Sequence, residues 1–231
     1  MNSFDTSTIE FLNRFAGEWH RFDEFVSLLA DLDLVKGGVF MALLWWAWYR
    51  NGALGPNTRS YVVMALVTAV IAVGLGRGLA HTLPFRERPL HASGFDFTQP
   101  YGADEDLFSS WSSFPSDHAA MFVALATSMF FIWRPLGIFA AIYAFIFILL
   151  PRMYLGLHWP TDIIAGAALG GVIAWVGMQP RVREPVDRIA FWVHDAYPGI
   201  FYAGAFLLTY QIATLFLDSR RGGAFVYHTL F

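Results

Sequence analysis

The sequence has 231 residues, of which 56% are hydrophobic and only 14% are charged, and its mean hydropathy is +0.47. Soluble domains carry about 25% charged residues, so this composition is typical of a protein with several membrane-spanning helices. The net charge is −3 and no basic cluster occurs, which argues against nucleic acid as a partner. The absence of cysteine excludes disulfides and thiolate catalysis.

Residues 8–32 carry apolar side chains at helical spacing: Phe11, Leu12, Phe15, Trp19, Phe22, Phe25, Val26 and Leu29. Acidic and basic residues lie between them, too many for a segment that spans a bilayer. We therefore predict an interfacial amphipathic helix over 8–32. The first eleven residues lack a positively charged region before an apolar stretch, so we expect no cleavable signal peptide.

Six apolar stretches then approach the roughly 20 residues that a spanning helix needs. They are 34–49, 60–81, 118–133, 136–154, 163–178 and 199–217. A second interfacial helix is predicted around 189–194, and the spacing of Gly166 and Gly170 predicts close helix packing. We expect an all-α fold with one membrane domain over 1–231, about six transmembrane helices and the N-terminal interfacial helix.

The basic residues of the short connections predict the orientation. One side of the membrane would carry Arg50, Arg59, Arg134, Arg181, Arg183 and Arg188, and the other Asp96, Asp104, Glu105 and Asp106. The basic side should be cytoplasmic, which places the connection 82–117 on the extracytoplasmic side. Arg220 and Arg221 would also fall outside and argue mildly against this orientation.

Arg152, His158 and Asp162 lie between the fourth and fifth apolar stretches. Pro160 favours a helix start there, so Asp162 would lie in the first turn and reach back to the imidazole of His158. A carboxylate bonded to one ring nitrogen leaves the other as a nucleophile. An interfacial histidine beside an N-terminal helix carboxylate explains this motif equally well.

Pro115-Ser116-Asp117-His118 opens the third apolar stretch. Backbone N–H groups at a helix N-terminus and the Ser116 hydroxyl form an anion site, and His118 beside it would protonate a leaving oxygen. Ordinary helix capping by Ser116 or Asp117 is the alternative.

Arg88-Pro89 follows the second stretch. Arginine binds phosphate through a planar fork, but a single Arg-Pro pair in a loop does not by itself indicate a phosphate site. Alternating topology, however, brings all three motifs to one membrane face. Charged groups there are costly unless they line a site, and a bound phosphate would be their natural partner.

These motifs resemble those of the type 2 phosphatidic-acid phosphatase superfamily, whose members are integral membrane lipid phosphatases. The family pattern is Lys, six residues and Arg-Pro; Pro-Ser-Gly-His; and Ser-Arg, five residues, His, three residues and Asp. The match covers residues 77–162. The resemblance implies a phosphohistidine formed on His158, an orienting carboxylate in Asp162, a general acid in His118, and no metal or other cofactor.

The resemblance also implies a set of phosphate-binding residues: Arg88, Arg152, Ser116 and the N–H of Asp117. Three positions depart from the pattern. His81 stands where the family has lysine and is expected to bind phosphate in its place. Asp117 replaces glycine as in the bacterial undecaprenyl-diphosphatase branch, and Pro151 replaces serine. A neutral imidazole at His81 would leave the phosphate one positive charge short, so we expect Arg77 or Arg86 to compensate.

The connection between the first two motifs is rich in aromatic residues: Phe95, Phe97, Tyr101, Phe108, Trp111 and Phe114. This outer loop either guides a lipid headgroup to the site or simply caps the bundle.

The leading hypothesis is a lipid phosphatase of the cytoplasmic membrane that hydrolyses undecaprenyl diphosphate at an extracytoplasmic site. Phosphatidic acid, phosphatidylglycerol phosphate and lipid A 1-phosphate are alternative substrates, and phosphotransfer to another acceptor is an alternative reaction. A non-catalytic lipid-phosphate binding or transport protein would need only the arginines. A metal site made of His118, His158 and Asp162 fits by ligand type, but the two arginines beside it would repel the cation.

Overall fold

The computed structural model describes residues 2–102 and 111–219, and these residues form helices and connections without a strand. The N-terminal part contains α1 (Ser3–Asn13), α2 (His20–Asp31), the π-turn η1 (Leu34–Gly38) and α3 (Val39–Tyr49). The central part contains α4 (Thr58–Thr82), the short 3₁₀ turn η2 (Pro89–His91), α5 (Asp117–Ile132), α6 (Arg134–Ala144), the π-turn η3 (Phe145–Leu149), α7 (Leu150–Tyr154) and α8 (Pro160–Gly177). Two helices complete the described chain, α9 (Pro180–Ala196) and α10 (Pro198–Ala213).

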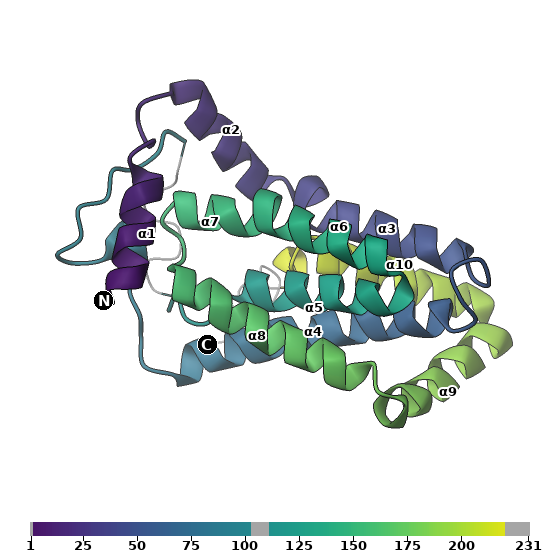
Figure 1. Cartoon of the computed structure of the whole chain (residues 1–231). Coiled ribbons are helices and arrows are strands. Elements are labelled where there is room, and N and C mark those ends of the chain that lie inside the picture. The colour runs from purple at the N-terminus through teal and green to yellow at the C-terminus, as the bar shows by residue number, and fades with distance from the viewer. Residues whose placement is uncertain (1, 103–110, 220–231) are drawn as a thin grey trace, which may run out of the picture.

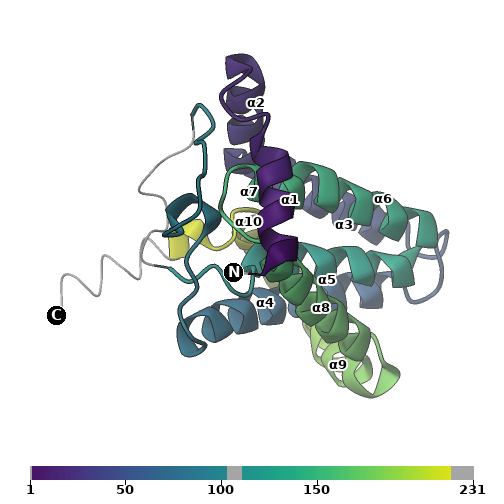
Figure 2. The same ribbon diagram turned by 60° about the vertical axis from the view of Figure 1, so that its left-hand side comes forward.

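The prediction of one amphipathic helix over 8–32 is wrong, because the chain breaks between α1 and α2. Gly17 adopts a left-handed φ of +80°, which favours glycine, and its N–H donates to Asp23. Both helices keep apolar side chains exposed, among them Phe11, Phe25 and Trp19 at the junction. Figure 2 shows α2 projecting at the top of the molecule and α1 below it, across the front of the bundle.

Helix α5 forms the centre of the bundle and packs against α4, α6 and α8. Its apolar side chains, such as Met121, Phe122 and Leu125, are fully buried. The prediction of close packing at Gly166 and Gly170 is confirmed, because a Cβ on either glycine would collide with the backbone of α5. Small residues of this kind let helix backbones approach closely in a membrane.

Each of the six predicted apolar stretches is helical, and the fold is a membrane helix bundle. In the described chain, α4, the continuous segment Arg134–Tyr154 and α8 are long and apolar enough to cross a membrane, and Leu34–Tyr49 and Asp117–Ile132 are shorter apolar helices. Helix α10 has 16 residues. The predicted second interfacial helix lies within the longer helix α9, which has exposed Ile189 and Trp192 on one face.

The three motifs meet at one end of the bundle, which we call the motif end. Figure 1 shows that α4 and α7 end there, α5 and α8 begin there, and α1 lies across it. Helix α9 lies at the opposite end (Figure 1). The side-by-side arrangement predicted from alternating topology is therefore confirmed for these four helix ends.

Candidate active site

A cavity of about 350 Å³ opens at the motif end. Its charged and titratable lining comprises Asp31, Asp33, Lys36, Arg77, Arg88, Asp117, His118, Arg152 and His158. The structure thus brings together both histidines and both arginines that the motifs single out. Four other predicted site residues do not line this cavity: Asp162, Ser116, His81 and Arg86.

His158 lies in the short connection between α7 and α8 and is buried. Its Nδ1 is 2.9 Å from the carbonyl oxygen of Ser113 and 3.8 Å from Oδ2 of Asp162. Since a carbonyl only accepts hydrogen bonds, Nδ1 carries the proton and Nε2 carries the lone pair. The imidazole is therefore oriented mainly by the Ser113 carbonyl, which the sequence did not indicate.

The pKa of His158 lies below the ordinary histidine value of 6.5. Burial is the main cause, because it disfavours the charged imidazolium. The positive charges of Arg88 and Arg152 lower the pKa further, and Asp162 opposes them. This environment keeps His158 neutral near pH 7, the state in which a ring nitrogen is nucleophilic.

Asp162 is fully buried in the first turn of α8. Its Oδ2 accepts from the backbone N–H of Trp159 at 2.8 Å, which caps the helix, and its Oδ1 accepts from Arg86 at 2.5 Å. Asp162 thus acts on His158 across 3.8 Å while its nearer bonds fix the helix start and Arg86.

Arg86 donates hydrogen bonds to two carboxylates and does not line the cavity. Its second terminal nitrogen donates to Asp5 of α1 at 2.5 Å, and Asp5 also accepts from the backbone N–H and hydroxyl of Thr161. The expectation that Arg86 compensates for His81 by binding phosphate does not fit these contacts. Arg86 instead links α1 to Asp162, as a positioning residue.

His118 sits in the first turn of α5 between two charged groups. Its Nε2 is 2.6 Å from a terminal nitrogen of Arg152, and its Nδ1 is 2.8 Å from Oδ1 of Asp117. A guanidinium only donates, so Nε2 is the acceptor and Nδ1 carries the proton toward Asp117. This arrangement leaves His118 and Arg152 in contact beside the cavity, with a carboxylate ready to stabilise an imidazolium.

At the start of α5, the contacts favour helix capping, the alternative to an anion site. The Ser116 hydroxyl, fully buried, caps α5 by accepting from the N–H of Ala119 at 3.3 Å. The Asp117 side chain accepts from Nε of Arg77 at 3.0 Å and from the N–H of His118. Helix capping therefore occupies the Ser116 hydroxyl, and Asp117 brings a negative charge to the cavity wall.

Arg77 and Arg88 both line the cavity. Arg77 bonds to Asp117 and to the carbonyl of Leu215, so its charge is partly neutralised. Arg88 is buried and donates to the carbonyl of Leu157 beside His158. Burial lowers the pKa of Arg88, while the carboxylates of Asp117 and Asp162 raise it; its guanidinium stays charged at neutral pH.

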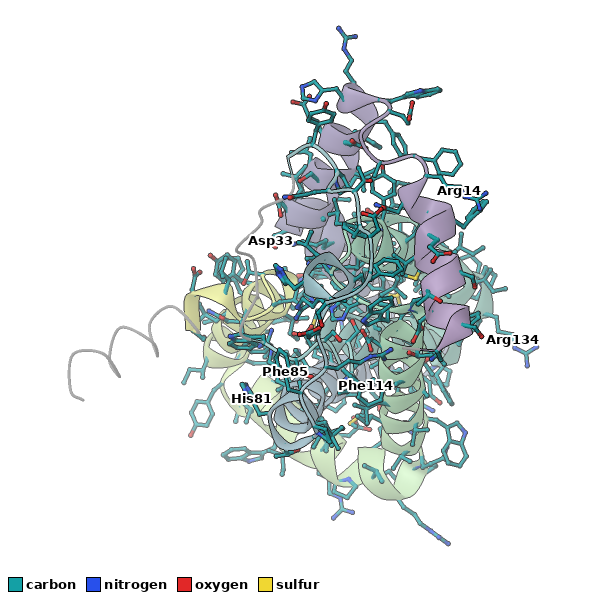
Figure 3. The ribbon with its side chains drawn as sticks, turned by 90° about the vertical axis from the view of Figure 1, so that its left-hand side faces the viewer. Arg14, Asp33, His81, Phe85, Phe114 and Arg134 are labelled. Atoms are coloured by element: carbon teal, nitrogen blue, oxygen red, sulfur yellow. The ribbon has the colours of Figure 1, made fainter. Side chains whose placement is uncertain are left out.

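His81 does not line the cavity. It is exposed near the end of α4, and its ring packs edge-on against Trp111 at a centroid distance of 5.2 Å. The expectation that His81 binds phosphate is thus at odds with its position. Figure 3 looks onto the motif end and shows His81 well apart from Asp33, which lines the cavity.

The described part of the aromatic loop covers the bundle. Phe95 packs edge-on against Trp159 at 5.3 Å, and Phe97 is partly buried against the core. Tyr101 and Trp111 are exposed, and Phe108, like Asp104, Glu105, Asp106, Arg220 and Arg221, lies outside the described residues. The contacts of Phe95 and Phe97 favour the capping role. Within residues 2–102 and 111–219, no three histidine or acidic side chains converge to hold a metal ion.

Four charged residues of this end were not predicted from the sequence: Asp5, Asp31, Asp33 and Lys36. Lys36 lies inside an apolar stretch, where a charged residue marks a functional site by default, so it offered a signal. Asp5 offered none, because its buried position depends on α1 folding back over α8.

The sequence pattern of the PAP2 superfamily matches residues 59–184, more than half of the chain. The chain belongs to the PAP2 superfamily. An undecaprenyl-diphosphatase of Sulfolobus acidocaldarius is 31% identical over 58% of this chain and 61% of its own length. A lipid A 1-diphosphate synthase of Escherichia coli is 30% identical over 66% of this chain and 63% of its own length.

The chain thus spans somewhat less than two thirds of these two curated relatives. Among solved structures, the crystal structure of Aquifex aeolicus LpxE matches with a TM-score of 0.57 and 21% identity, over 77% of this chain and 96% of that one. That likeness supports the membrane helix bundle. Residues 2–58, which supply Asp5 and Lys36, precede the matched region.

Proposed function

We propose that this PAP2 protein is a metal-independent lipid phosphatase that works through a phosphohistidine. The observation that carries the proposal is the state of His158. The carbonyl of Ser113 accepts the Nδ1 proton of His158, which leaves Nε2 with the lone pair, and His158 lines a cavity together with Arg88 and Arg152. A binding protein would need the two arginines but not a histidine held in this tautomer.

In the first step, Nε2 of His158 attacks phosphorus and the bond from phosphorus to the leaving oxygen breaks. His118, which takes up a proton from water at Nε2 once Arg152 has turned to the phosphate, gives that proton to the leaving oxygen, and Asp117 stabilises the imidazolium form from the Nδ1 side. Arg152 donates to His118 at 2.6 Å without substrate. It would turn to the phosphate oxygens together with Arg88 as the negative charge enters.

In the second step, water attacks the phosphohistidine, His118 accepts the proton of that water, and the bond from phosphorus to Nε2 breaks. Inorganic phosphate leaves and His158 returns to its neutral form. The cycle therefore balances without a metal ion or any other cofactor.

Among lipid phosphates we favour undecaprenyl diphosphate, hydrolysed at the extracytoplasmic side of the cytoplasmic membrane. The Pro-Ser-Asp-His motif and the relative from Sulfolobus acidocaldarius support this substrate. Phosphotransfer is the second candidate function, because another relative is named a lipid A 1-diphosphate synthase. Transfer differs only in the acceptor that replaces water at the phosphohistidine.

The test is phosphate release in detergent from a panel of lipids: undecaprenyl diphosphate, phosphatidic acid, phosphatidylglycerol phosphate and lipid A 1-phosphate. We expect release that persists in EDTA, is inhibited by vanadate and is abolished in His158→Ala. The matched control is His20→Ala, which removes an exposed histidine and should retain activity.

Full activity in His158→Ala, or no release from any lipid, would overturn the proposal. Loss of activity in EDTA would instead favour the metal site. A phosphorylated acceptor formed in place of free phosphate would establish phosphotransfer, and lipid binding without either product would establish the non-catalytic alternative.

A further inference from the structure

Lys36 is the only lysine in the chain, and it is buried. It lies in η1, at the start of the apolar segment Leu34–Tyr49. A buried ammonium group in such a segment is costly unless it is paired or lines a polar site. We therefore expect the ammonium group of Lys36 to have a negatively charged partner.

The partner in the structure is Asp33, whose Oδ1 is 3.1 Å from Nζ of Lys36. The Asp33 side chain is 35% exposed, whereas that of Lys36 is 8% exposed. The carboxylate is thus partly hydrated, and water screens its attraction for the ammonium. An ion pair of this kind stabilises a buried charge only in part.

Lys36 and residues of all three motifs line one cavity. Lys36 lines it together with Arg88 and His158, and its charge interacts with those of Arg152 and His118. Like charges that share a cavity repel each other, and an anion between them removes this cost.

The carboxylates of the cavity do not neutralise all of its positive charge. Asp117 is bound to Arg77 and His118, and Asp33 is bound to Lys36. The lining contains three carboxylates, those of Asp31, Asp33 and Asp117, and four cationic side chains, those of Lys36, Arg77, Arg88 and Arg152. One positive charge therefore remains in excess when both histidines are neutral. A phosphate would neutralise it.

We propose that Lys36 binds the phosphate group of the substrate and supplies the positive charge that the exposed His81 does not. This inference rests on the proposed function and names a further ligand of its phosphate. Lys36 precedes the matched region 59–184 in the sequence and still lines the cavity. The alternative is a structural role, in which Lys36 only pairs with Asp33 at the start of η1.

Because Lys36 is the only lysine, its labelling by an amine-reactive reagent can be followed by peptide mass spectrometry in the unmutated protein. We expect inorganic phosphate or vanadate to slow labelling at Lys36, and to do so equally in His158→Ala, which cannot turn over. Labelling that does not respond to either anion would overturn the proposal, because a merely structural lysine would not be shielded.

Kinetics supply the second test. A charge-assisted contact to phosphate is lost in Lys36→Gln, so kcat/KM should fall by about 10- to 100-fold, mainly through KM. Lys36→Arg should recover most of this loss, because arginine also binds phosphate. The matched control Arg134→Gln removes one exposed positive charge at the other end of the bundle and should change neither parameter. An unchanged kcat/KM in Lys36→Gln would refute the assignment.

The two proposals fail in different ways. If the unmutated protein releases no phosphate from any lipid, the proposed function is wrong, yet shielding of Lys36 by phosphate would still identify an anion site. If the protein is active and neither anion shields Lys36, only the assignment of Lys36 is wrong.

Discussion

The contact between α8 and α5 at Gly170 allows a sharp test of how the bundle aligns the site. A Cβ on Gly170 would lie 2.8 Å from the carbonyl carbon and 3.0 Å from the Cα of Ala120. Carbon atoms normally pack at about 3.5–4.0 Å, so Gly170→Ala would push the two helices apart by roughly 1 Å. Backbone atoms form the obstacle, and no side chain can rotate away.

This displacement acts directly on the chemistry, because α5 carries His118 and α8 begins just after His158. A misplacement of about 1 Å between reacting groups costs about 100-fold in rate, and overpacking costs about 1–3 kcal/mol of stability. We therefore expect Gly170→Ala to lower kcat by about 100-fold and to lower the thermal transition.

The assay is phosphate release together with a thermal melt in the same detergent. The matched control is Gly171→Ala on the same helix, where the added Cβ meets nothing within 4 Å. That variant should keep its activity and be stabilised by up to about 1 kcal/mol, because alanine is the better helix former. Equal effects of the two substitutions would refute the reasoning.

Two further predictions concern the buried polar groups. The pKa of His158 lies below 6.5, so the neutral, nucleophilic imidazole persists as the pH falls to 6.5 and is lost only at lower pH. We therefore expect kcat/KM to fall on the acid side below pH 6.5. A pH profile of kcat/KM whose acid limb is centred above pH 6.5 would contradict this. Asp5→Asn removes the charge that holds Arg86 against Asp162. It should lower the free energy of unfolding by about 1.5–3 kcal/mol and lower kcat. The control Asp195→Asn changes an exposed carboxylate and should leave the thermal melt and the activity unchanged.

The sequence predicted the helical stretches and the meeting of the motifs well, because both follow from hydropathy and alternating topology. The glycine spacing of α8 was equally informative, since only small residues allow the observed approach to Ala120. These features depend on patterns that run along one element of the chain.

Contacts between distant segments escaped prediction. The carbonyl of Ser113 that orients His158 carries no side-chain signal, and the bonds from Asp5 to Arg86 join residues 81 positions apart. The break between α1 and α2 was missed because the apolar spacing continues across Gly17, which has a positive φ and donates a hydrogen bond to Asp23.

The length of α5 has a consequence for how water reaches the reaction. Helix α5 has 16 residues and a length of about 24 Å, less than the roughly 30 Å of a hydrocarbon core. Exposed Trp133 follows its C-terminus and is suited to a membrane surface; with Trp133 at that surface, His118 at the other end would lie several ångströms below the opposite one. Because α4, α6 and α8 pack around α5, the charged cavity would be the polar route to this depth. A lipid phosphate would have to leave the headgroup plane to react, and the water that completes turnover would enter by the same polar route.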